Sequence, residues 1–182
     1  MVTKHTLVAL VEDKPGVLNR MASLFRRRGF NIDSIAVGHS ETPGLSRVTL
    51  VVDGTATMVE QVRKQLDKVI DVVKVSDLTE SNLVARELAL IKVNTTPATR
   101  SSVMQIVDIF RANIIDVSPD SVTVEVTGDE DKVDSLYNLL RGFGIRELAR
   151  TGRIALVRGG SKPLPADKEA PQTTTPEKTS PK

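Results

Sequence analysis

The fold is decided by the stretch LVALVEDKPGVLNRMASLFRRRGFNI, residues 7–32. A run rich in β-branched residues and leucine, Lys4–Val11, predicts a buried strand, and the turn Asp13–Pro15 ends it. Apolar residues then recur at helical spacing as far as Gly29, which predicts a helix that starts at Gly16. The stretch is therefore a strand, a tight polar turn and a helix.

The start of this helix is a candidate site for a small ligand. A helix N-terminus offers unpaired N–H groups and a positive dipole end, and Gly16 lets a carboxylate approach the N–H groups of Gly16 and Val17 closely. The Asp13 carboxylate or the Asn31 amide oxygen could accept a hydrogen bond from an ammonium group. Each residue alone also fits a plain turn or capping role, but together they favour a site for a free amino acid.

The rest of the first half adds a hairpin, a helix and a strand. Asn31–Val37 and Ser46–Asp53 alternate as strands on either side of the turn Glu41–Gly44. Thr57–Ile70 is amphipathic at helical spacing, and Val72–Leu78 is a closing strand. The predicted order is β-α-β-β-α-β.

The same order starts again after a polar break at Thr79–Asn82. The pattern predicts a strand over Leu88–Val93, a helix over Ser101–Phe110, a hairpin of Asn113–Val117 and Val122–Thr127, a helix over Asp131–Leu140, and strands over Ile145–Leu148 and Ile154–Val157.

The two halves superpose as a sequence repeat. Val48 lies over Val122 with an offset of 74 (122 − 48), and Pro15 lies over Pro97 with an offset of 82 (97 − 15). The missing residues are expected in the loop around Pro43, since loops tolerate deletion. We therefore predict an α+β protein of two tandem ferredoxin-like βαββαβ domains, each of a size that can fold independently.

The expected domain boundaries follow from this repeat. The first domain is expected over residues 4–78, a linker over 79–85 and the second domain over 86–158. From Gly159 onward the chain lacks large apolar residues apart from Leu164 and is rich in Pro, Thr and Lys. Residues 159–182 are therefore expected to form a disordered tail.

Composition excludes several classes of protein. The chain has no cysteine, so it has no disulfide or thiolate metal site, and a cytoplasmic location is expected. No apolar run approaches a membrane span, and the first residues lead into a strand instead of a signal peptide. The histidines, His5 and His39, lack the neighbours of a metal site or a nucleophilic triad. We expect no catalytic residue and no metal site in this chain.

The predicted fold is shared by RNA-recognition modules, copper chaperones and amino-acid-sensing regulatory domains. RNA recognition of this type needs aromatic side chains on the central strands, but Asn31–Val37 and Ser46–Asp53 have none and the net charge is only +2. Copper delivery needs thiolates. Binding of a small molecule remains, with no nucleic acid or membrane partner expected.

Arg26, Arg27 and Arg28 occupy the last turn of the first helix. Cations suit the negative end of a helix dipole, so a solvated helix end is the simpler interpretation. A docking patch for a partner is the other interpretation.

The second half lacks the glycine at the start of its first helix. Ala98 superposes on Gly16, and its methyl group would stand where a ligand must approach, although Asn113 retains the position of Asn31. The effector site is therefore expected in the first half only, which leaves the second half free to dock a partner.

The sequence resembles a known family over Lys4–Arg158. The stretches that carry the resemblance are VEDKPGVLNRMASLFRRRGFNIDSIAVG, PGLSRVTLVV, KQLDKVIDVVKVSDLTE, VARELALIKV and FRANIIDVSPDSVTVEVTG. They are similar to the small regulatory subunits of acetolactate synthase (acetohydroxyacid synthase), which have an N-terminal ACT domain.

The resemblance implies a function without catalysis by this chain. Such a subunit activates a separate large catalytic subunit, which is expected to use thiamine diphosphate, Mg and FAD, and confers feedback inhibition by valine in branched-chain amino acid biosynthesis. ACT domains of the family pair side by side as a homodimer with valine at the interface. The implied effector-binding residues are Asp13, Gly16, Val17 and Asn19 of one chain and Asn31 and Ile32 of the other.

Two other functions stay open at this point. An ACT-domain regulator could sense a different amino acid or control transcription, although the sequence has no helix-turn-helix and no basic stripe. A stand-alone enzyme is the weakest alternative.

Overall fold

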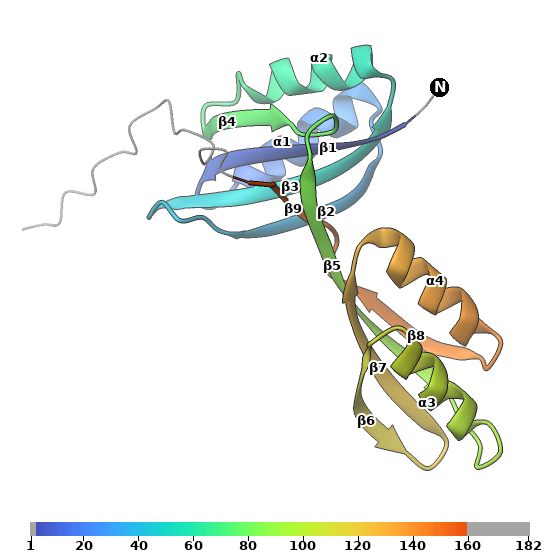
Figure 1. Cartoon of the computed structure of the whole chain (residues 1–182). Coiled ribbons are helices and arrows are strands. Elements are labelled where there is room, and N and C mark those ends of the chain that lie inside the picture. The colour runs from blue at the N-terminus through green and yellow to red at the C-terminus, as the bar shows by residue number, and fades with distance from the viewer. Residues whose placement is uncertain (1–2, 160–182) are drawn as a thin grey trace, which may run out of the picture.

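The structure is a computed structural model that describes residues 3–159, and its two halves share one architecture. In each half an antiparallel sheet has two helices packed on one face (Figure 1). This confirms the predicted α+β fold of two tandem ferredoxin-like domains. The tail expected from residue 159 lies outside the described residues apart from Gly159 itself.

The first half has the predicted order of elements. They are β1 (Thr3–Glu12), α1 (Val17–Arg28), β2 (Ile32–His39), β3 (Leu45–Gly54), α2 (Ala56–Leu66) and β4 (Val72–Asp77). The sheet order is β2-β3-β1-β4, which leaves β2 at an edge. Its core is formed by the apolar faces of α1 and α2 packed on alternate residues of β1 and β3, such as Phe25 and Leu66 on Leu7 and Leu50.

Helix α2 ends four residues earlier than the predicted helix Thr57–Ile70. The N–H groups of Lys68 and Val69 donate to the carbonyls of Gln65 and Leu66, so tight turns replace helical hydrogen bonds there. The chain then enters β4 with Asp71 buried, and this residue becomes important at the candidate site.

The second half repeats the pattern and ends with an additional strand. Its elements are β5 (Leu83–Asn94), α3 (Arg100–Ile109), β6 (Asn113–Ser118), β7 (Ser121–Gly128), α4 (Glu130–Arg141), β8 (Ile145–Arg150) and β9 (Ile154–Val157). The sheet order is β6-β7-β5-β8, so β6 lies at the edge that corresponds to β2. The core again consists of apolar residues of both helices on the two central strands, including Leu136 and Ile91.

Irregularities in the sheets recur at matching positions. The register shifts between Leu10 and Val11 in the β1–β4 pairing and between Lys92 and Val93 in the β5–β8 pairing, an offset of 82 (92 − 10). A second shift follows Ile32 in β2 and Ile114 in β6, again with an offset of 82 (114 − 32). Bulges are retained features of a fold, so their recurrence supports a duplicated unit.

The shortening of the second half is not confined to the loop around Pro43. Five residues, 40–44, connect β2 to β3, whereas two, Pro119 and Asp120, connect β6 to β7. The strands are also shorter, since β2 and β3 have 8 and 10 residues and β6 and β7 have 6 and 8. Two paired strands must keep matching lengths. The difference in length between the two halves is therefore spread over both strands and the loop of the hairpin.

Strand β5 runs through both halves (Figure 1). It begins at Leu83 instead of Leu88, so the last three residues of the expected linker 79–85 are strand. Its first four residues, Leu83–Arg86, pair with β9, and the remainder pairs with β7 and β8. This pairing is not local in sequence, which is why periodicity did not predict it.

The β9 strand meets the face of the first sheet that the helices leave open. The Arg47 guanidinium of β3 donates to the carbonyl of Ala155 over 2.9 Å, and Ala155 is 2% exposed. Residues on that sheet face, among them Val8 and Leu10, are also buried. The C-terminal strand thus helps to bury apolar surface of the first half.

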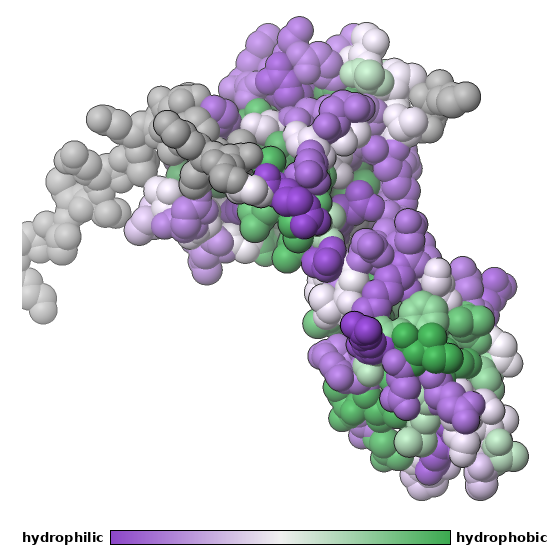
Figure 2. Space-filling model, in the orientation of Figure 1, coloured by the Kyte–Doolittle hydropathy of each residue, from purple (hydrophilic) through white to green (hydrophobic). Residues whose placement is uncertain are grey.

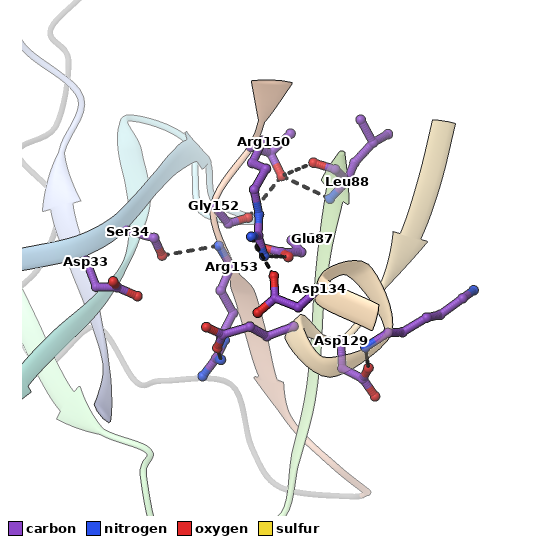
Figure 3. Close-up of polar contacts among 12 residues, drawn as sticks. Asp33, Ser34, Glu87, Leu88, Asp129, Asp134, Arg150, Gly152 and Arg153 are labelled. Atoms are coloured by element: carbon purple, nitrogen blue, oxygen red, sulfur yellow. Dashed lines mark hydrogen bonds and ion pairs between the residues drawn. The ribbon is translucent and has the colours of Figure 1, made fainter. Parts of the chain in front are cut away.

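A polar cluster joins the two halves at this junction. Arg150 donates to Glu87 and, over 2.7 Å, to Asp134, while the main-chain N–H of Arg153 donates to the Ser34 hydroxyl (Figure 3). The Gly152 backbone lies so close to β2 that a Cβ there would be 3.1 Å from the carbonyl oxygen of Ile35. The loop after β8 therefore requires glycine where it meets β2.

Candidate functional site

The turn after β1 holds the start of helix α1 open. The Asp13 N–H donates to the carbonyl of Gly44 over 2.9 Å, which fixes the turn against the start of β3. Gly16 has φ +90°, a left-handed conformation that L side chains rarely adopt, and there is open space where a Cβ would be. The sequence-based expectation of a glycine-dependent turn at this position agrees with this geometry.

No side chain within residues 3–159 caps the first turn of α1, and that turn contains no acidic residue. The other helix of the same half differs, because the Thr55 hydroxyl accepts from the N–H of Met58 at the start of α2. The free N–H groups after Gly16 can therefore donate hydrogen bonds to an anionic ligand such as a carboxylate.

Three predicted site residues surround this opening in different ways. Asp13 is exposed, and its Oδ2 lies 3.3 Å from Nδ1 of His39, a residue for which the sequence analysis predicted no role. Val17 is 3% exposed and points into the core, so only its backbone N–H faces the turn. Asn19 is exposed on the outer surface of α1 beside Arg20. The hairpin register, which pairs His39 with Ser46 near the end of β1, could have indicated the contact with Asp13.

Asn31 and Ile32 lie at the other end of α1. Helix α1 has 12 residues, and a rise of about 1.5 Å per residue makes such a helix roughly 18 Å long. One chain therefore does not bring these two residues to Gly16. Asn31 is exposed, and its side chain makes no hydrogen bond to any described residue, whereas Ile32 packs partly on the core.

The corresponding positions of the second half are occupied by internal contacts. At the start of α3 the hydroxyl groups of Thr96 and Thr99 accept from each other's backbone N–H groups over 3.2 and 2.9 Å. The Asn113 amide, the counterpart of Asn31, donates to Glu125 over 3.2 Å. The turn before α3 and the Asn113 amide are thus engaged within the fold, although the first turn of α3, like that of α1, has no side-chain cap.

A buried carboxylate lies beside the open turn. Asp71 is 1% exposed; its Oδ2 accepts from Arg20, and its Oδ1 lies 3.1 Å from Nζ of Lys14, which also pairs with Glu12. Burial alone would raise the pKa of Asp71, but the ion pair with Lys14 and the hydrogen bond from Arg20 together outweigh burial and lower it. Hydrogen bonding to Glu12 and then to Asp71 raises the pKa of Lys14. The turn before Gly16 is therefore held by a network of ionised groups.

Other kinds of site have less support in the described part of the chain. No group of three or more His, Cys, Asp or Glu side chains in residues 3–159 is arranged to hold a metal ion. No helix among these residues is both long and apolar enough to cross a membrane.

Comparison with known families agrees with this geometry. Residues 7–74 match the family described as an AHAS small subunit-like ACT domain, and residues 86–159 match the family described as the small subunit of acetolactate synthase. A relative from Archaeoglobus fulgidus, a probable acetolactate synthase small subunit, is 57% identical over 159 residues, which cover 87% of this chain and 99% of the relative. The chain belongs to the family of acetolactate synthase small subunits.

Other members of the acetolactate synthase small-subunit family match over similar lengths. The Mycobacterium bovis small subunit is 54% identical over 85% of this chain and 92% of its own length, and that of Bacillus subtilis is 48% identical over 91% and 96%. The crystal structure of the small subunit from Thermotoga maritima has a TM-score of 0.80 and 46% identity, and covers 87% of this chain and 99% of that one. The family resemblance and the fold are therefore confirmed. The assignment implies a regulatory role and a large catalytic subunit as the partner.

Proposed function

We propose that the chain activates the large catalytic subunit of acetolactate synthase and makes it sensitive to valine. The observation that carries the effector proposal is the uncapped helix start at Gly16, together with the unpartnered Asn31 amide one helix length away. A zwitterionic amino acid needs donors for its carboxylate and an acceptor for its ammonium group, and these two places offer both.

The separation of the two places supports a site shared by two copies. Strand β2 is at the edge of its sheet and begins directly after Asn31, so its outer backbone groups are free to pair with a second chain. In such a two-fold pair, Asp13, Gly16, Val17 and Asn19 of one chain face Asn31 and Ile32 of the other. We propose a homodimer through the first halves with valine at this interface.

The second half has a surface suited to the large subunit. Ile109 is 76% exposed at the end of α3, and Ile115 and Val117 on edge strand β6 are 51% and 59% exposed. Figure 2 shows apolar side chains gathered on the visible face of the second half. Exposed apolar groups on an edge strand are typical of protein interfaces. We propose that the catalytic partner, which would supply thiamine diphosphate, Mg and FAD, docks there, and that the assembly is cytoplasmic.

We also propose boundaries for the two domains. The ACT domain would extend over residues 4–78 and the second domain over 86–158, in keeping with the family matches at 7–74 and 86–159. The connection between them is shorter than the proposed 79–85, since β5 starts at Leu83.

Titration with amino acids tests the proposed function. The full chain is titrated with valine, leucine and isoleucine by calorimetry, and the acetolactate synthase rate of a large subunit is measured with and without the chain and each amino acid. We expect the chain to raise the rate and valine to lower it. Binding of a different amino acid alone would favour another ACT-domain regulator, and an unchanged rate would contradict the proposed partnership.

A further inference from the structure

Asp71 contacts the chain on both sides of the turn that contains Gly16. Its carbonyl accepts from the N–H of Glu12 over 2.9 Å, which anchors the residue to the end of β1. Its two carboxylate oxygens then face Lys14, two residues before Gly16, and Arg20, four residues after it. One buried carboxylate thus connects the chain entering the turn with the helix leaving it.

The second half provides an internal comparison for this network. The N–H of Asn94 donates to the carbonyl of Gly144 over 2.9 Å, so Gly144 occupies the backbone position of Asp71. Gly144 has φ +93°, where an L side chain is strained, and a Cβ there would lie 2.7 Å from the side-chain amide nitrogen of Asn94. The chemistry of Asp71 is therefore absent from the equivalent position.

The two cations are also absent from the second half. With the offset of 82, Lys14 corresponds to Thr96 (96 − 14) and Arg20 to Ser102 (102 − 20). The second half nevertheless forms the same sheet, helices and bulges. It holds the corresponding turn with a different side chain, since Arg146 donates to Asn94 and Asp120. The fold therefore does not require Lys14, Arg20 and Asp71 in particular, and these three occur in the half that has Gly16.

Burying a carboxylate is costly unless it is paired, so the buried pairing of Asp71 with Lys14 and Arg20 adds little net stability to the fold. Asp71 itself is inaccessible to a ligand, because it is 1% exposed. Lys14 and Arg20 have side chains that are 50% and 52% exposed, and they flank the opening. Any effect of Asp71 on a ligand must pass through these two residues and the backbone between them.

We propose that Asp71 is a positioning residue of the effector site, which holds Lys14 and Arg20 on either side of Gly16 and so keeps the donors of the helix start aligned for a carboxylate. This inference rests on the proposed function and adds a residue that does not touch the effector.

The test separates effector binding from folding and activation. In the full chain, Asp71→Asn keeps the size of the side chain but removes its charge, and valine binding is measured by calorimetry. We expect affinity to fall at least about tenfold, the scale of losing a hydrogen bond to a charged group. Activation of the large subunit without valine is expected to match that of the unmodified chain, because the proposed docking surface lies in the other half.

Glu60→Gln is the matched control, since it removes one carboxylate from an exposed ion pair with Arg63 on α2. It should leave valine affinity unchanged. Lys14→Met is the second variant, because this exposed side chain can be replaced without burying an unpaired charge in the event that Asp71→Asn does not fold. It should weaken valine binding in the same direction, and Lys14→Arg should restore it.

The outcomes distinguish the inference from the function on which it rests. Unchanged valine affinity in Asp71→Asn, or in Lys14→Met if the first variant does not fold, would overturn the positioning role while the effector site stands. Loss of valine binding, activation and thermal stability together in Asp71→Asn would overturn it too, because the residue would then serve only the fold. Failure of the unmodified chain to bind valine, leucine or isoleucine would remove both proposals.

Discussion

Lys4 in β1 and Glu130 at the start of α4 lie 2.5 Å apart, from Nζ to Oε1, although 126 residues separate them in the sequence. Lys4 also lies 3.0 Å from Asp33, the residue that follows Ile32 in β2, and Arg153 donates to the other oxygen of Glu130. The predicted effector strand is thus two ion pairs away from the helix of the second half. These ion pairs connect β2 with the half that we propose docks the large subunit.

The first prediction concerns this junction. Glu130→Gln should leave the fold intact and lower the free energy of unfolding by about 0.2–1 kcal/mol, the range for partly exposed ion pairs. In a double-mutant cycle with Lys4→Met, the two losses should be less than additive, because each variant removes the shared Lys4–Glu130 contact in addition to one of its own. Urea unfolding at low and high salt provides the measurement, and strict additivity would contradict the coupling.

The pH dependence of the same contact has a defined sign. Hydrogen bonds to Glu130 and then to Asp33 raise the pKa of Lys4 above its ordinary value of 10.5. A raised pKa in the folded state means that the contribution to stability is complete below pH 10.5 and is lost as the pH rises through the folded value. On the alkaline side of neutrality, the difference in stability between the unmodified chain and Glu130→Gln should therefore stay constant until the pH enters this range and shrink within it.

The second prediction concerns Gly16. Gly16→Asp should abolish inhibition by valine and preserve activation of the large subunit, because it places a carboxylate over the donors of the helix start. Gly16→Ala has the same backbone strain at φ +90° and places a methyl group in the ligand's space but adds no charge, so it should weaken inhibition less than Gly16→Asp. Reconstituted enzyme assays over a valine series measure both. Equal loss in the two variants would attribute the effect to strain instead of charge.

The third prediction tests the proposed docking surface. Val117→Asp places a charge on the exposed edge strand β6 and should abolish activation of the large subunit while valine binding to the isolated chain persists. Thr127→Asp, on the neighbouring strand β7 and also exposed, is the control for an added charge elsewhere on the second half. Pull-down and rate measurements with the large subunit decide the matter; equal activation by both variants would exclude β6 from the interface.

The fourth prediction concerns β9. Ala155→Asp should lower the free energy of unfolding by about 1–3 kcal/mol, because it buries a polar group against the first sheet. The neighbouring Leu156 is 59% exposed, so Leu156→Asp should have little effect. Similar unfolding midpoints for the two variants would mean that β9 does not bury the open face of the first sheet. For the same reason, a fragment ending at Thr79 should be less stable than the whole chain.

Local patterns were enough to predict much of this fold. The strand–turn–helix around Gly16, the two hairpins and the repeat follow from apolar periodicity and from glycine and proline positions, which depend on neighbouring residues only. The early start of β5 at Leu83 and its pairing with β9 depend on residues some 70 positions away, and periodicity does not report such contacts.

The candidate site shows the same limit. Gly16 was predicted because its conformation is a property of a four-residue turn, and Asn31 because it opens a strand. The contact between Asp13 and His39 and the burial of Asp71 depend on sheet register and on where α2 ends, so the sequence did not reveal them. The separation of Gly16 from Asn31, by contrast, follows from the predicted helix between them, and α1 has the expected extent.

The last prediction tests whether two chains share one site. If each site takes Gly16 from one chain and Asn31 from the other, Gly16→Asp and Asn31→Ala chains should each bind no valine as homodimers. Mixing them in equal amounts under exchange makes about half the dimers mixed, and each mixed dimer has one intact site, so about a quarter of the sites should be restored under two-fold symmetry. Calorimetric stoichiometry before and after mixing measures this recovery. A site built within a single chain would give no recovery, because every chain in the mixture would carry one of the two defects.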